Sequence, residues 1–159
     1  MKKAMFLFML LVLAATLSAQ TGLFGIWYGA KAEDVKALLK SQGFGDGTQN
    51  GAEIDYTPPA ESKLPKISLT LTDDHTLLSY WSITYYLSDN PDVMLDILSN
   101  IAQVHGEASV VADFGVDYIW YFPDNHALYV YEYSDKAVLN YTNGNWDDDD
   151  YYWYEEYWY

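Results

Sequence analysis

The 159-residue sequence contains no cysteine and no arginine. Without cysteine, disulfide bonds, a thiol nucleophile and a lipid attached to a cysteine side chain are excluded. Without arginine, the chain lacks the planar guanidinium group that grips phosphate or carboxylate through two parallel hydrogen bonds. A single domain of this length can nevertheless bury enough apolar surface to fold without crosslinks.

Long apolar runs are also absent, except for one over residues 4–13. Lys2 and Lys3 precede this run and small residues ending at Ala19 follow it, which is the order of a secretory signal peptide. The run is shorter than the about 20 apolar residues that a membrane-spanning helix needs. We therefore expect residues 1–19 to direct export to the periplasm or the extracellular space. After their removal we expect no stable membrane insertion.

Acidic side chains outnumber basic ones by 23 to 8, so the formal net charge is −15. Cleavage after Ala19 would remove two lysines and leave 6 against 23 acidic residues, a charge of −17. Such a surface repels nucleic acid and anionic lipid. A basic protein, a cation or a neutral glycan remains a suitable partner. The 16 tyrosines and 6 tryptophans favour contact surfaces of low entropic cost.

Apolar periodicity predicts two helices. The first follows Gly29 and ends before Gly43, and the second begins at Asn90 and Pro91 and ends at Gly106. Their apolar sides consist of Val35, Leu38, Leu39, Met94, Ile97, Leu98 and Ile101.

Alternation of apolar and polar residues predicts strands around the second helix. Their ranges are 53–57, 66–72, 77–87, 108–113, 117–122, 127–133 and 136–142. The glycine-rich residues 45–51 are predicted to form a loop. This order favours an α+β fold with one domain over residues 20–143, an antiparallel sheet and two helices on one face. It is also compatible with a tandem α-β-β-β duplication.

The segment Gly25-Ile26-Trp27-Tyr28-Gly29, followed by Asp34-Val35 and Leu38-Leu39, resembles the beginning of several small exported bacterial α+β domains. These include the β-lactamase-inhibitor-protein-like fold and the small lipoprotein of the outer-membrane assembly machinery. The chain departs from the lipoprotein because it has no cysteine to carry the lipid. The resemblance implies a non-enzymatic domain that presents a sheet face to a protein partner, and it identifies no individual functional residue.

Motifs for catalysis or metal binding, such as G-x-S-x-G and H-E-x-x-H, are missing. Of the three histidines, His75 and His126 are expected in turns. His105 is expected at the end of the second helix, where a cation suits the helix dipole. The many carboxylates keep a small hydrolase with a pair of acids as an alternative, because a sequence cannot reveal their separation.

Aromatic residues alternate along three predicted strands, so each row shares one face. The rows are Tyr118-Trp120-Phe122 and Tyr129-Tyr131-Tyr133, together with Tyr80 and Tyr86 opposed to Trp81 and Tyr85. Such rows are typical of a packed sheet face. Since residues 77–87 have aromatic side chains on both faces, one of these faces is available to a partner or a sugar ring.

Residues 144–159 form a tail in which acidic and aromatic side chains dominate and basic ones are lacking. Three interpretations are open: a solvated tail with mutually repelling aspartates, a recognition segment, and a weak Ca²⁺ site. The predicted partner-binding residues are Trp146, Tyr151, Tyr152, Trp153, Tyr154, Tyr157, Trp158 and Tyr159. The candidate metal ligands are Asp147, Asp148, Asp149 and Asp150; an EF-hand is disfavoured because Asp150 stands where that loop needs glycine.

The sequence thus favours an exported, non-catalytic binding domain for a protein partner, of basic character if the charge steers the encounter. A carbohydrate-binding module that uses exposed tryptophan and tyrosine is the first alternative, and a small acid-pair hydrolase is the second.

Overall fold

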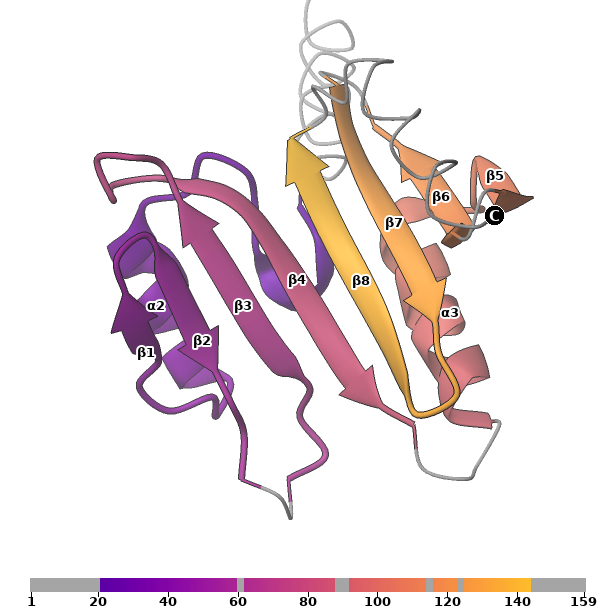
Figure 1. Ribbon diagram of the computed structural model, residues 1–159, viewed down its shortest axis with the longest axis horizontal. Coiled ribbons are helices and arrows are strands. Elements are labelled where there is room, and N and C mark those ends of the chain that lie inside the picture. Colours follow the sequence, from indigo (N-terminus) through magenta and orange to yellow (C-terminus); the bar gives the residue numbers. More distant parts are fainter. Residues whose placement is uncertain (1–20, 60–61, 88–91, 114–115, 123–124, 144–159) are drawn as a thin grey trace, which may run out of the picture.

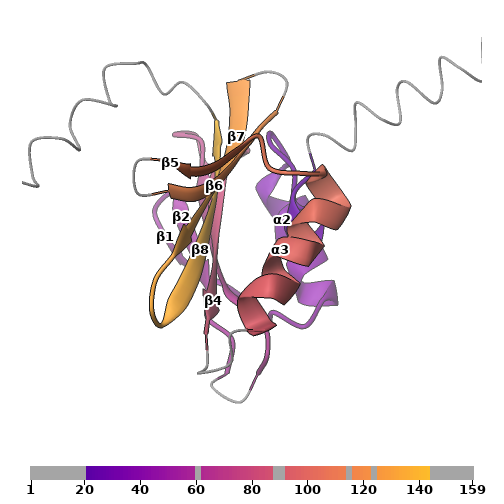
Figure 2. The same ribbon diagram turned by 90° about the vertical axis from the view of Figure 1, so that its right-hand side faces the viewer.

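The computed structural model describes residues 21–59, 62–87, 92–113, 116–122 and 125–143. They form two layers, an eight-stranded antiparallel sheet and the helices α2 (Ala32–Ser41) and α3 (Asp92–His105). Both helices lie on the same side of the sheet (Figure 2). A short 3₁₀ helix, η1 (Leu23–Gly25), precedes α2. The predicted α+β class is confirmed.

The strands follow one another in the sheet in the order β1-β2-β3-β4-β8-β7-β6-β5 (Figure 1). Their bounds are β1 (Thr48–Asn50), β2 (Glu53–Tyr56), β3 (Lys66–Leu71), β4 (Leu78–Tyr86), β5 (Val110–Asp113), β6 (Val116–Tyr121), β7 (His126–Glu132) and β8 (Lys136–Asn143). Each α-helix is followed by four strands, and the last strands of the two sets, β4 and β8, pair at the centre. The predicted unit of three strands per helix is therefore wrong.

The missing strand, β1, lies inside residues 45–51, which the sequence analysis assigned to a loop. Its three residues are polar and exposed, so they lack the alternation that identifies a half-buried strand. The turn to β2 uses Gly51, whose φ of 62° is accessible to glycine at no steric cost. β1 and β2 thus form a tight hairpin at the edge of the sheet.

The two helices pack their predicted apolar sides against the sheet. Val35 and Leu39 of α2 are fully buried, and Met94, Ile97 and Ile101 of α3 are buried as well. Within the described ranges, no helix combines the length and the apolar character needed to span a membrane.

The strands alternate between the helix side and the opposite side of the sheet. In β3, Ile67, Leu69 and Leu71 are buried under the helices, and the intervening residues point away from them. In β4, Trp81 and Ile83 continue the buried layer. Leu77, the first residue of the predicted strand 77–87, precedes β4 and is exposed.

Where the two sets of strands meet, the core contains hydrogen-bonded aromatic groups. Trp81 of β4 stacks on Tyr141 of β8 with ring centroids 4.5 Å apart. The Tyr141 hydroxyl accepts a hydrogen bond from the backbone N–H of Leu23 at 3.1 Å and lies 3.0 Å from Nε2 of His105. This cluster joins η1, α3, β4 and β8 at the middle of the domain.

Candidate functional site

The face of the sheet turned away from α2 and α3 carries no helix within the described part of the chain (Figures 1 and 2). We call it the open face. Strand register places one residue of each strand in a single row across it. In sheet order this row is Thr48, Asp55, Ser68, Ser82, Asn140, Tyr129, Ile119 and Val110. The row is polar on β1, β2, β3, β4 and β8, and it is aromatic or aliphatic on β7, β6 and β5.

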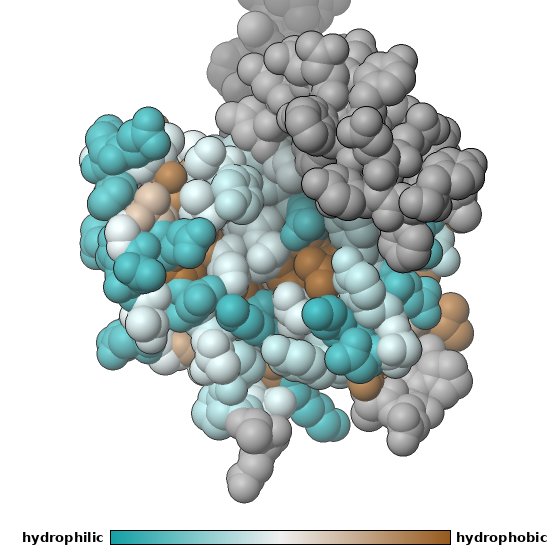
Figure 3. Space-filling model, in the orientation of Figure 1, coloured by the Kyte–Doolittle hydropathy of each residue, from teal (hydrophilic) through white to brown (hydrophobic). Residues whose placement is uncertain are grey.

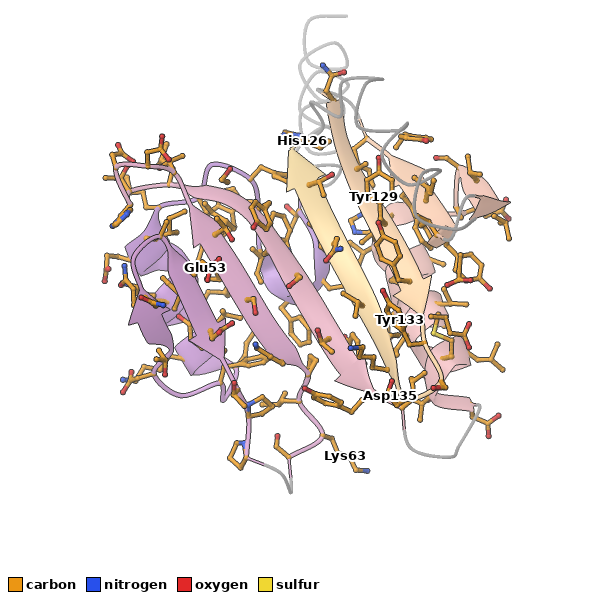
Figure 4. All side chains as sticks on the ribbon, viewed as in Figure 1. Glu53, Lys63, His126, Tyr129, Tyr133 and Asp135 are labelled. Atoms are coloured by element: carbon orange, nitrogen blue, oxygen red, sulfur yellow. The ribbon has the colours of Figure 1, made fainter. Side chains whose placement is uncertain are left out.

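The polar part contains a shallow hollow of about 250 Å³ over β2, β3 and β4. We call it the polar hollow. Its lining consists of Glu53, Asp55, Lys66, Ser68, Leu69, Thr70, Tyr80 and Ser82. Hydrophilic side chains gather over these strands on the open face (Figure 3), and Glu53 is among them (Figure 4).

Asp55 is the best-connected side chain of the polar hollow. Its Oδ1 accepts a hydrogen bond from the Ser68 hydroxyl at 2.5 Å and lies 3.2 Å from Nζ of Lys66. The Ser68 hydrogen bond, and then the Lys66 ammonium group, hold the pKa of Asp55 below its ordinary value. Asp55 is therefore an anion with a fixed orientation.

The other part of the open face is aromatic. We call Ile119, Tyr121, Tyr129, Tyr131 and Val138 the aromatic patch. Register sets Ile119 opposite Tyr129, and Tyr131 opposite Val138. Tyr121 is 59% exposed, whereas Ile119 is only 7% exposed. Burial, and then the neighbouring Tyr121, raise the pKa of the Tyr129 hydroxyl.

The predicted aromatic rows divide between the two faces. Tyr118, Trp120 and Phe122 belong to the helix side and pack on the core, where Nε1 of Trp120 donates to the Gly106 carbonyl at 3.0 Å. Tyr129 and Tyr131 belong to the open face. Tyr133 lies one residue beyond β7 and is exposed (Figure 4).

On β4 the expected split of aromatic side chains is confirmed. Trp81 and Tyr85 face the helices, and burial raises the pKa of Tyr85 to about 12. Tyr80 and Tyr86 remain 45% and 68% exposed. Of these two, Tyr80 lines the polar hollow.

One of the three expectations for histidine is wrong. His126 begins β7 and stacks on the Tyr28 ring at 3.8 Å, so it does not lie in a turn. His105 ends α3 as expected, and because burial lowers its pKa to about 4, its ring is neutral at pH 7. His75 lies in the turn before β4, with a φ of 59°.

The residues predicted for the tail fall outside the described residues. This applies to the aromatic set Trp146, Tyr151, Tyr152, Trp153, Tyr154, Tyr157, Trp158 and Tyr159, and to the candidate Ca²⁺ ligands Asp147, Asp148, Asp149 and Asp150. Among the residues that are described, no group of three or more His, Cys, Asp or Glu side chains could hold a metal ion.

The polar hollow contains two carboxylates, Glu53 and Asp55, as an acid-pair hydrolase would require. Such an enzyme also needs a carboxylic acid that keeps its proton near neutral pH. Asp55 is ionised, which is the state that the second carboxyl of such a pair takes. The polar hollow thus combines these two carboxylates with the ammonium group of Lys66 and the hydroxyl groups of its lining.

Sequence reasoning did not single out Asp55, Lys66 or Ser68. The alternation in residues 66–72 put Ser68 and Thr70 on the non-core face, and this was the available signal. Their proximity to Asp55 follows from the pairing of β2 with β3, which alternation does not reveal. Comparisons with protein-family models, with curated proteins and with solved structures find no match to this chain.

Proposed function

We propose that this protein is an exported, non-catalytic domain that binds a protein partner through the aromatic patch on its open face. The observation that supports this most directly is the position of Tyr121, Tyr129 and Tyr131 on a sheet face that no described helix covers. Tyrosine is enriched at the energetic centres of protein interfaces, because it offers a large contact area with few rotatable bonds.

The charge of the chain supports a basic partner. After removal of residues 1–19, a formal charge of −17 attracts a positively charged protein over distances comparable to the Debye length, about 8 Å at physiological ionic strength. The tail adds acidic and aromatic groups directly after β8, the strand next to β7. We include residues 144–159 as a second contact segment of the same interface.

The proposal retains three further expectations from the sequence: export by residues 1–19, the resemblance to small exported domains with a partner-binding sheet face, and a tandem duplication. The repeated order of one helix and four strands, with β4 and β8 adjacent, supports a duplicated α-β-β-β-β unit. The carbohydrate-binding alternative concerns a different part of the open face, the polar hollow.

The test uses the chain from residue 20 onward as bait for periplasmic and extracellular proteins of the source cells. The patch variant Tyr121→Ser/Tyr129→Ser and a truncation after residue 143 are compared with the unaltered bait. The matched control is Tyr86→Ser, an exposed tyrosine outside the aromatic patch.

We expect a partner that the unaltered bait and the Tyr86→Ser control recover and that the patch variant loses. With the isolated partner, the double substitution should weaken binding at least about tenfold, since anchor tyrosines commonly cost 2 kcal/mol or more. Recovery of the same proteins at the same affinity by all four baits would refute the proposal.

A further inference from the structure

The polar hollow combines charged groups, hydroxyl groups and an exposed aromatic ring. Its lining includes three aliphatic hydroxyl groups, two carboxylates, one ammonium group and the phenol ring of Tyr80. It lies over β2, β3 and β4, so it does not overlap the aromatic patch on β6, β7 and β8. Its chemistry therefore concerns a different ligand from the proposed protein partner.

We propose that the polar hollow binds a single neutral sugar ring. Tyr80 would supply the flat apolar surface for one face of the ring, and Asp55, Lys66 and Ser68 would contact its hydroxyl groups. This inference does not rest on the proposed protein partner.

The donors and acceptors of the hollow suit vicinal hydroxyl groups. Both contacts of the Asp55 carboxylate with described residues use Oδ1, so Oδ2 keeps its lone pairs for a ligand hydroxyl. The ammonium group of Lys66 spends one N–H on Asp55 and has two more to donate. An acceptor and a donor that are already held together can each engage one of two adjacent sugar hydroxyls without reorganisation.

The charge of the site selects against anionic ligands. Two carboxylates and one ammonium group leave a local formal charge of −1, inside a chain of charge −15, so an anion is repelled. A cation is attracted by this charge, but at Asp55 it competes with the ammonium group of Lys66. A neutral polyol can use the carboxylate and the ammonium group together.

Size and the position of Tyr80 define the ligand further. The hollow measures about 250 Å³, below the 300–1,000 Å³ typical of pockets for drug-sized molecules, so one ring fits and an extended chain would project out of it. Tyr80 is 45% exposed and stands opposite Thr70 at the border of the hollow. The C–H groups on one side of a pyranose carry partial positive charge and pack on the negative face of an aromatic ring.

The experiment is a nuclear magnetic resonance titration of the chain from residue 20 onward. The ligands are the methyl glycosides of glucose, galactose, mannose and N-acetylglucosamine. Methyl glucuronide serves as an anionic comparison and methylammonium as a cationic one. The amide signals of Ser68 and Ser82 and the ring signals of Tyr80 report on the hollow, and those of Ile119 and Tyr129 report on the aromatic patch.

We expect saturable shifts in the hollow for at least one neutral glycoside, with a dissociation constant on the order of 1 mM, as suits a shallow site. Tyr80→Ser and Asp55→Asn should each weaken this binding at least about tenfold. Tyr86→Ser, which removes an exposed tyrosine of the same strand outside the hollow, should change it less than twofold. The patch variant Tyr121→Ser/Tyr129→Ser should bind the sugar normally, so a failure of one proposal leaves the other standing.

Three results would overturn the inference. The first is the absence of any shift in the hollow with all four neutral glycosides at about 20 mM, well above a millimolar dissociation constant. The second is sugar-induced shifts confined to Ile119 and Tyr129. The third is saturable binding of methyl glucuronide or methylammonium in the hollow without binding of a neutral glycoside.

Discussion

The two sets of four strands have the same order of elements but differ in their open faces. In the first set, β1 to β4, the helix side combines aliphatic residues such as Ile67 and Leu69 with Tyr56 and Trp81. The open face of this set is hydroxyl-rich and charged, with Tyr80 and Tyr86 exposed along β4. In the second set, the helix side contains hydrogen-bonded aromatic groups, and the open face carries the aromatic patch.

This difference suggests that the first set mainly stabilises the fold, whereas the second set also presents a surface for binding. An apolar inner layer and a polar outer layer are sufficient for a sheet to fold in water. Aromatic side chains on an outer face contribute the full free energy of apolar burial only when a partner covers them. The second set therefore has the composition of a contact surface. The two sets are joined by the pairing of β4 with β8, where Trp81 stacks on Tyr141, and we call this junction the seam.

The strongest test of that seam is Trp81→Ala. Trp81 is 0% exposed and contacts both Tyr28 and Tyr141, so its truncation leaves a cavity between the sets. We expect the free energy of unfolding to fall by about 3–5 kcal/mol, as for other buried tryptophans. Urea denaturation followed by circular dichroism measures this loss.

Trp81→Phe is the matched control. Phenylalanine keeps a ring for Tyr141 and removes an indole N–H that is buried without a hydrogen-bond partner among the described residues. It should therefore cost much less than Trp81→Ala. Equal losses in the two variants would mean that ring stacking does not hold the seam together.

The second prediction compares two buried tyrosines, one in each set. Tyr141→Phe removes the hydroxyl that accepts from Leu23 and pairs with His105, so polar groups are left unsatisfied. We expect a loss of about 1–3 kcal/mol in the free energy of unfolding. Tyr56→Phe should cost less than about 0.5 kcal/mol, because no hydrogen bond within the described part of the chain involves the Tyr56 hydroxyl. Urea denaturation measures both losses. A similar loss for the two variants would contradict the expectation that the hydrogen bonds of Tyr141 stabilise the junction of the two sets.

The third prediction concerns pH and the same seam. His105 titrates at about 4 in the folded protein and near its ordinary value of 6.5 when unfolded, because burial disfavours its cation. Between these values the unfolded chain binds more protons, so the stabilisation present above pH 6.5 is lost as the pH falls toward 4. The His105→Gln variant keeps an acceptor for Tyr141 without titrating. We expect the melting temperature of the unaltered protein to fall more steeply than that of this variant between pH 7 and 4.

Carboxylates also titrate in this range, so the comparison is the difference between the two proteins rather than either curve alone. Parallel curves from pH 7 to 4 would show that His105 is not buried as a neutral side chain. The seam would then not depend on its protonation state.

Most elements of this fold could be predicted from local pattern. The spacing of Val35, Leu38 and Leu39 predicted α2, and the alternation around Ile67 predicted β3, because each pattern records which side of an element is buried. The edge strand β1 has no buried side and therefore left no such pattern. The state of His105 depends on burial by residues distant in sequence, which no local signal records.

The open face could not be predicted for a related reason. Within a single strand, alternation shows which residues lie on the same face as Ser68, Ser82 or Tyr129. Only register joins these three residues in one row, and a slip of one residue would reverse the face of every side chain. The sequence thus predicted aromatic and polar strands, but not the border between a polar hollow and an aromatic patch.

The smallest expected effect comes from Asp55→Asn in the polar hollow. The substitution removes an ion pair with Lys66 and weakens the hydrogen bond from Ser68, but both partners are only partly buried. Exposed ion pairs contribute about 0.2–1 kcal/mol, so the free energy of unfolding at pH 7 should fall by less than about 1 kcal/mol. Since the folded protein lowers the pKa of Asp55, this contribution is present above pH 3.8 and is lost on further acidification, and the variant lacks that dependence. A loss above about 2 kcal/mol would contradict the comparison, because it would make the polar hollow part of the folding framework instead of a surface free to bind a ligand.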